Sequence, residues 1–141
     1  MGHDLIKYEA HHEVFHDFHL WLLRHFFVEQ SRALENAQPS KDRTELRKFF
    51  EDWDWLCPGV VVGTDFSLFI SRSHARWELM FQLLQRAGDR IASFGDDIPL
   101  SYLEEHINLQ WLAYCTKAQP TKPFLVDIGR ICKLLEKYEP I

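Results

Sequence analysis

Long apolar runs, an apolar N-terminal segment and a regular pattern of cysteines are all missing from these 141 residues. No uninterrupted apolar stretch approaches the length of about 18 residues that a membrane-spanning helix needs. The N-terminal residues MGHDLIKYEAHH lack the apolar core of a signal peptide. The cysteines Cys57, Cys115 and Cys132 are odd in number and widely spaced, which argues against a disulfide framework or a zinc knuckle. These absences predict a cytoplasmic protein with no membrane segment.

Several motifs that mark enzymes are also absent. The six glycines are scattered, and neither GxGxxG nor GxxxxGK[ST] occurs, so no phosphate-binding loop is predicted. The GxSxG turn of hydrolases is missing as well. Cys57 precedes Pro58, but no pattern in the sequence brings a histidine to it as an activating base. An enzyme is therefore the less favoured interpretation, and no catalytic residue is predicted.

Positive charge is in short supply. The chain has 16 Lys and Arg against 21 Asp and Glu, a net charge of −5, and no basic cluster is longer than a pair. A nucleic-acid-binding protein needs a basic stripe to displace counterions from phosphates, so this class is excluded. An acidic surface is better matched to a basic protein partner, or simply to solubility.

Aromatic residues and helical periodicity are abundant. The hydrophobic share is 46% and the aromatic share 14%, enough for one core in a single domain that spans 1–141. Apolar residues three and four apart, separated by Pro and Gly connections, predict an all-α bundle of about five helices. The expected helices cover residues 4–35, 42–56, 64 or 65 to about 94, 101–114 and 123–138. The VVVG stretch at 60–63 favours an extended backbone, but no partner strand is evident, so we expect a buried linker there.

Six of the eight histidines fall within the first 25 residues. On a helix, Glu9, His12, His16 and His19 would share one side, where imidazoles one turn apart are in reach of one metal ion. The same histidines would also suit the border between core and solvent, or a surface that responds to pH. The sequence leaves these three interpretations open, and the structural one is favoured.

The H-x-x-x-E element formed by His74 and Glu78 resembles that of the hemerythrin-like HHE domains. The resemblance implies a helical bundle with a metal centre of iron or zinc, to which His12, His16, His74, Glu78 and His106 would contribute as ligands. The match is partial: Gln110 stands four residues after His106, where the family has histidine, and the last expected helix has no histidine. Without this resemblance, no metal ligand and no cofactor is predicted.

The stretch EDWDW at 51–55 is the most suggestive partner-binding feature. Trp53 continues the core stripe of its expected helix, whereas Trp55 is displaced from it by about 200° and either packs under the following linker or anchors a partner. Acidic residues also gather in FGDDIP and at the start of the next helix. The predicted partner-binding residues are Glu51, Asp52, Asp54, Trp55, Asp96, Asp97, Glu104 and Glu105.

In size, charge and lack of a catalytic signature, the chain resembles bacterial immunity proteins and antitoxins. This resemblance implies a small acidic protein that occludes a basic partner, such as a toxin, by covering its active site. Two alternatives remain: the metal-binding bundle described above, and a structural subunit whose apolar surface pairs with a second copy of the chain.

Overall fold

The computed structural model describes residues 3–53, 63–106 and 117–141. The helices are α1 (Asp17–Ala37), α2 (Lys41–Glu51), α3 (Ser67–Ile70), α4 (His74–Ala92), α5 (Leu100–His106) and α7 (Lys122–Glu136). The strands are β1 (His3–Tyr8), β2 (His11–His16), β3 (Gly63–Asp65), β4 (Asp97–Ile98) and β5 (Gln119–Pro120). The protein is therefore mixed α/β, and the expected all-α bundle is wrong.

The largest difference from expectation lies at the N-terminus, where residues 3–16 form an antiparallel hairpin. Alternate residues of β1 are buried, namely Asp4, Ile6 and Tyr8, while Lys7 is exposed. This period of two is the strand pattern, and it buries one face of the hairpin. The helix expected from residue 4 therefore begins only at Asp17.

The hairpin also supplies the strand partner that the VVVG stretch was thought to lack. β3 begins at the last residue of that stretch and pairs in parallel with β1, with Ile6 opposite Thr64. The resulting sheet has the order β2-β1-β3. The expected linker at Gly63 is thus the start of a strand, and residues 60–62 lie outside the described part of the chain.

The long helix expected up to residue 94 is divided into α3 and α4. Ser71 and Arg72 both have positive φ, 47° and 60°, which an α-helix does not tolerate. Ser73 then caps α4, because its side chain accepts a hydrogen bond from the backbone N–H of Arg76 at 3.2 Å. The apolar stripe of the sequence continues through the break, so periodicity alone does not reveal it.

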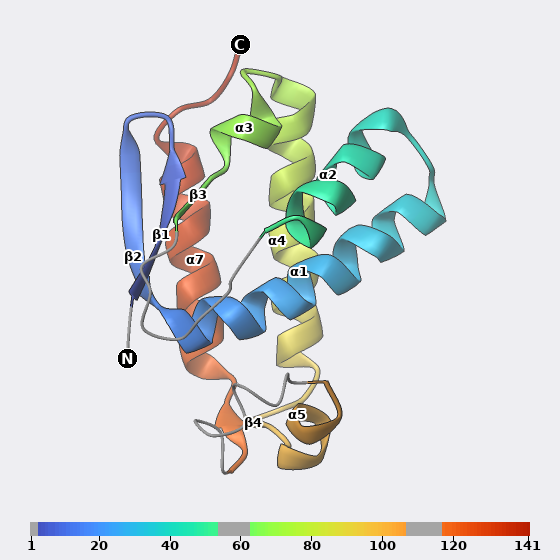
Figure 1. Ribbon diagram of the computed structural model, residues 1–141, viewed down its shortest axis with the longest axis vertical. Coiled ribbons are helices and arrows are strands. Elements are labelled where there is room, and N and C mark those ends of the chain that lie inside the picture. Colours follow the sequence, from blue (N-terminus) through green and yellow to red (C-terminus); the bar gives the residue numbers. More distant parts are fainter. Residues whose placement is uncertain (1–2, 54–62, 107–116) are drawn as a thin grey trace.

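The sheet and the helices form two layers (Figure 1). The β1–β2 hairpin lies against α7, α4 and α7 pack side by side, and α1 crosses α4 and packs along α2. Two long-range hydrogen bonds tie the C-terminal part to this body: the hydroxyl of Tyr8 donates to the carbonyl of Tyr138 at 2.7 Å, and the indole of Trp77 donates to the carbonyl of Leu135 at 3.0 Å. Among the described residues, none of the helices is long and apolar enough to cross a membrane.

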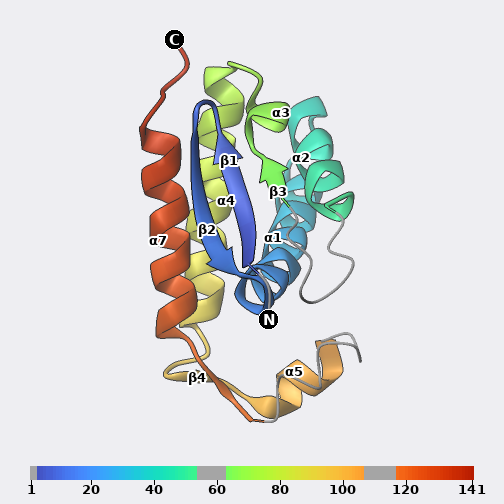
Figure 2. The same ribbon diagram turned by 60° about the vertical axis from the view of Figure 1, so that its left-hand side comes forward.

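A separate end of the molecule is formed by β4, β5 and α5, opposite the C-terminus (Figure 2). β4 and β5 pair in antiparallel register, with Asp97 opposite Pro120. Thr121 fixes the turn that precedes β4. Its backbone N–H donates to the carbonyl of Asp96 at 2.9 Å, and its hydroxyl donates to the carbonyl of Gly95 at 2.8 Å. Gly95 has a φ of 86°, a conformation in which other residues are strained.

Candidate functional site

Four of the predicted partner-binding residues lie together at this separate end. Asp96 directly precedes β4, Asp97 begins it, Glu104 and Glu105 stand on α5, and all four are exposed. We call these four residues the acidic end. Within the described part of the chain none of them forms an ion pair with Lys or Arg, and Nε2 of His106 lies 4.0 Å from the carboxylate of Glu105.

The acidic end holds most of the net charge of the protein. Residues 91–106 contain these four acids and no Lys or Arg, which gives −4 of the total of −5. The remainder of the chain has 17 acids and 16 bases and is therefore close to neutral, at −1. Charge of one sign on a small exposed surface produces a local potential that attracts ligands of the opposite sign.

Tyr102 attaches α5 to the body of the protein. Its ring stacks on Phe26 of α1 at a centroid distance of 6.0 Å and meets Phe94 edge-on at 4.8 Å. Its hydroxyl is 2.7 Å from Nε2 of His25. The guanidinium of Arg90, 5.5 Å from the Tyr102 ring, adds a cation–π contact. These contacts fix the position of α5 against α1, and with it the backbone of Glu104 and Glu105.

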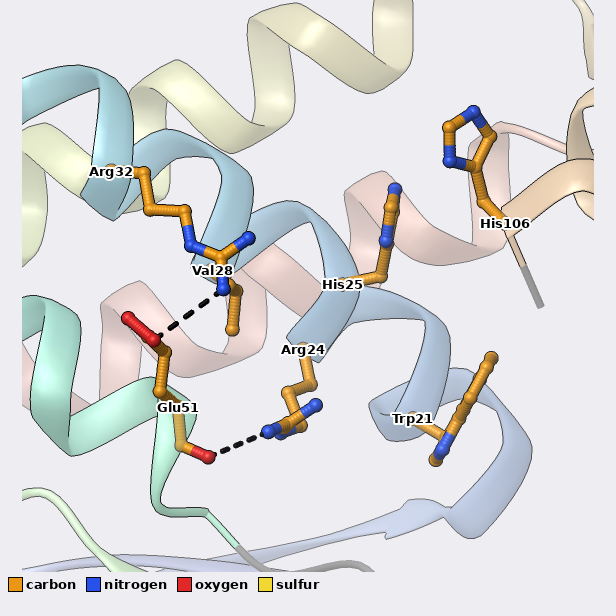
Figure 3. Close-up of a pocket in the computed structure, with 7 residues that line it drawn as sticks. All are labelled: Trp21, Arg24, His25, Val28, Arg32, Glu51 and His106. Atoms are coloured by element: carbon orange, nitrogen blue, oxygen red, sulfur yellow. Dashed lines mark hydrogen bonds and ion pairs between the residues drawn. The ribbon is translucent and has the colours of Figure 1, made fainter. Parts of the chain in front are cut away.

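A depression of about 350 Å³ lies beside this attachment, between α5 and the end of α2 (Figure 3). It is lined by Trp21, Arg24, His25, Val28, Arg32, Glu51 and His106. Arg24 donates to the backbone carbonyl of Glu51 at 2.8 Å, and Arg32 lies 3.4 Å from its carboxylate.

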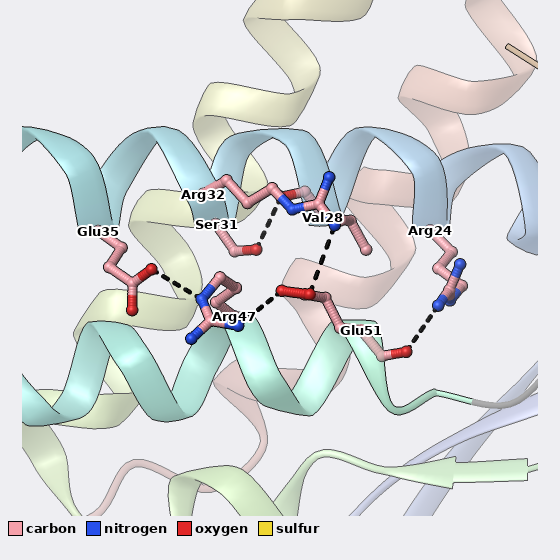
Figure 4. A network of polar contacts seen from close by, with 7 residues as sticks. All are labelled: Arg24, Val28, Ser31, Arg32, Glu35, Arg47 and Glu51. Atoms are coloured by element: carbon pink, nitrogen blue, oxygen red, sulfur yellow. Dashed lines mark hydrogen bonds and ion pairs between the residues drawn. The ribbon is translucent and has the colours of Figure 1, made fainter.

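Glu51 belongs to a network of charges that joins α1 to α2 (Figure 4). The guanidinium of Arg47 donates to Glu35 at 2.7 Å and to Glu51 at 2.8 Å. These hydrogen bonds raise the pKa of Arg47 and lower that of Glu51, while a hydrogen bond from Thr44, followed by that from Arg47, lowers the pKa of Glu35. The Glu51 carboxylate is thus already held by two arginines, although it was predicted to contact a partner.

The remaining residues of EDWDW differ in their exposure to solvent. Asp52 is exposed directly after α2, and Trp53 is buried, as its place in the core stripe predicted. Asp54 and Trp55 lie outside the described residues. The role of Trp55 as an anchor therefore stays a prediction.

The histidines implied by the hemerythrin resemblance are spread over the molecule. His12 is exposed on β2, His16 ends that strand, and His106 ends α5. His74 lies on α4, 3.6 Å from Glu78 and 3.6 Å from Glu139. In the described residues, no group of three or more His, Cys, Asp or Glu side chains is placed to hold a metal ion.

His25 gives the protein an expected pH dependence. Burial lowers the pKa of His25 below 6.5, an effect that Glu29 opposes and that the positive charges of His106, Arg90 and Arg24 reinforce. The unfolded chain therefore binds a proton more readily than the folded one, and the free energy of unfolding should decrease as the pH falls below 6.5. In urea unfolding measured over a pH series, His25→Gln should make the free energy of unfolding fall less steeply below pH 6.5 than in the wild-type protein.

The exposed His12 provides the control for this measurement. His12→Ala, which removes an imidazole from the exposed face of β2, is measured in parallel to show any general effect of losing one histidine. An identical slope in His25→Gln and wild type would contradict the burial of a neutral imidazole at position 25.

Comparisons with known proteins give no further information, since no family model, no curated protein and no solved structure matches the chain.

Proposed function

We propose that this protein binds a basic protein partner through the acidic end and acts by covering the partner's surface, in the manner of immunity proteins and antitoxins. The concentration of charge carries the proposal: four of the five net negative charges are on sixteen residues, at one end of the molecule. Lys and Arg side chains of a partner would find carboxylates there that no Lys or Arg of the described residues neutralises.

The surroundings of the acidic end support a binding role. Tyr102 and the aromatic contacts below it hold the backbone of α5 in place, so little ordering is needed on association. Opposite charges across an interface accelerate encounter and select partners more than they add affinity. We place this function in the cytoplasm, where Cys132, a half-buried free thiol, is kept reduced.

Charge neutralisation tests the proposal. The variant Asp96→Asn, Asp97→Asn, Glu104→Gln, Glu105→Gln changes the net charge from −5 to −1 at the acidic end. A matched control, Glu45→Gln, Glu78→Gln, Glu136→Gln, Glu139→Gln, changes it by the same amount at residues outside the predicted partner-binding set. Both variants replace carboxylates outside the core, so circular dichroism should show unchanged folding.

The readout is the set of proteins captured from a lysate of the source organism, identified by mass spectrometry, with each candidate then purified for titration calorimetry. We expect a basic partner that the control retains and the acidic-end variant loses, with affinity at least about tenfold weaker and less sensitive to salt. Capture of neutral or acidic partners only, or equal loss in both variants, would contradict the proposal. A solution mass equal to two chains without any partner would favour the structural homo-oligomer instead.

A further inference from the structure

A groove of about 510 Å³ runs between α4 and α7. Its lining is mainly apolar or small, and α7 contributes Leu125, Gly129 and Cys132 to it. In the described part of the chain α7 packs on α4 and on the β1–β2 hairpin. Its outer side lies at one edge of the molecule, where no described helix or strand covers it (Figure 2). The outer side of α7 and the groove beside it are thus open to a partner.

Gly129 opens this surface at the middle of α7. A methyl group added at its Cα would have no neighbour within 4 Å, so a larger residue would fit in the single chain. Glycine inside a helix costs about 1 kcal/mol relative to alanine. The described residues of the chain therefore give no reason for glycine here. A second helix gives one, because the distance between two packed helices depends on the side chains at their contact.

Two opposite charges stand at equal distances from Gly129. Lys122 and Glu136 are the first and last residues of α7, seven residues before and after the glycine, and both are exposed. Seven residues are nearly two turns of a helix, with a drift of only about 20°, so the three residues share one side. The helix dipole stabilises anions at the N-terminus and cations at the C-terminus, so each charge stands at the less favourable end. In the described part of the chain neither side chain forms an ion pair.

A second copy of α7 in antiparallel orientation matches this arrangement. We propose that two copies of the chain pair through α7, about a two-fold axis at Gly129. Lys122 of each chain then lies opposite Glu136 of the partner subunit, beside the helix end whose dipole favours it. The two-fold axis makes the interface isologous, so each of these contacts occurs twice.

The apolar residues next to Gly129 are covered in the same arrangement. Leu125 lies opposite Cys132 of the partner subunit, which closes the groove. Val126, whose side chain is 54% exposed in the single chain, lies opposite the methylene groups of Lys133 of the partner subunit. One helix from each chain makes a small interface, and small interfaces are weak, so we expect a dissociation constant in the micromolar range.

Sedimentation velocity of the untagged protein over a concentration series tests the pairing. The wild-type mass should rise from one chain toward two chains. Lys122→Glu and Glu136→Lys should each keep the mass of one chain, because like charges then face each other twice. Each substitution also supplies the charge that its helix end favours, so unfolding of α7 would not explain the loss. An equimolar mixture of the two variants should recover the mass of two chains, because opposite charges face each other again.

Gly129→Leu tests the close approach of the helices independently of charge. Leucine has room in the single chain and is the better helix former, so circular dichroism should show unchanged folding while the two-chain mass is lost. Lys41→Glu is the matched control for the charge reversals. Lys41 is exposed and is the first residue of α2, as Lys122 is of α7, and its reversal should leave the dissociation constant unchanged.

The pairing does not depend on partner binding at the acidic end, which lies at β4 and α5. The acidic-end variant should still form the dimer, and Gly129→Leu should still capture the basic partner. A wild-type mass of one chain at every concentration, or a two-chain mass that survives Gly129→Leu, would overturn the pairing. So would a mixture of the two charge variants that stays at one chain. A basic partner that is lost on Gly129→Leu, with no dimer in the wild type, would assign the groove to that partner instead.

Discussion

Replacing Phe66 by alanine should lower the free energy of unfolding by about 3–5 kcal/mol, the cost of removing a buried aromatic ring from a core. The Phe66 side chain is 0% exposed. Its ring centroid lies 5.8 Å from that of Phe49, 6.0 Å from that of Phe50 and 6.4 Å from that of Trp53. The backbone N–H of Phe66 also donates to the carbonyl of Lys7 at 2.8 Å. A cavity at this position would therefore weaken the junction of α2, α3 and the sheet at once.

Urea unfolding measures this effect, and the same short segment offers a control. Leu68 is 76% exposed, so Leu68→Ala should change stability by less than about 0.5 kcal/mol. If Phe66→Ala lowered the free energy of unfolding by less than about 1 kcal/mol, the ring would not be packed as described, because removing a buried aromatic ring costs more than that.

Ile6→Ala should have the second largest effect on stability, lowering the free energy of unfolding by about 2–5 kcal/mol. Ile6 is 0% exposed and lies in the middle of β1, the central strand of the sheet. Val14 of β2 is 42% exposed, on the other face of the hairpin, and Val14→Ala should cost less than about 1 kcal/mol.

The difference between Ile6→Ala and Val14→Ala follows from the alternation of buried and exposed residues along the hairpin strands. Urea unfolding measures it. Each substitution removes a β-branched side chain from a strand, so the difference in strand propensity is small. Equal losses for Ile6→Ala and Val14→Ala would mean that the hairpin does not bury one face.

The long helices α1, α4 and α7 were predicted from their apolar stripes, although α1 and α4 begin later than expected. Leu22 and Phe26 of α1, and Met80 and Leu84 of α4, occupy the core positions that their spacing indicated. Pro123 lies in the first turn of α7, where its missing N–H costs nothing. In these segments the local pattern and the tertiary packing agree.

The hairpin was not predictable in the same way, because its signals are ambiguous. Tyr8 and Phe15 are seven residues apart, a separation that fits two turns of a helix. In the hairpin both are buried, from different strands. The turn between them contains Glu9 at a φ of 53°. Glycine or asparagine at this position would have predicted a hairpin turn. A turn without these residues leaves a helical pattern as the better local interpretation.

Surface charge was easier to predict than the contacts between distant residues. Asp96, Asp97, Glu104 and Glu105 stand close in the sequence and are exposed, so the local composition located the acidic end. The pair of His19 with Asp127 joins residues 108 apart, and that of His25 with Tyr102 joins residues 77 apart. No local pattern marks such pairs, because the packing of α1 near α7 and α5 brings them together.

The most direct test of the acidic end is a titration of the ¹⁵N-labelled protein with an oligolysine peptide at low salt, followed through the backbone amide shifts. The peptide presents dense positive charge without a particular shape, so it reports where the potential of the protein is most negative. We expect the largest shifts at Asp96, Asp97, Glu104 and Glu105, and their loss in the acidic-end variant. Largest shifts around Glu45, Glu78 or Glu136 instead would contradict the account.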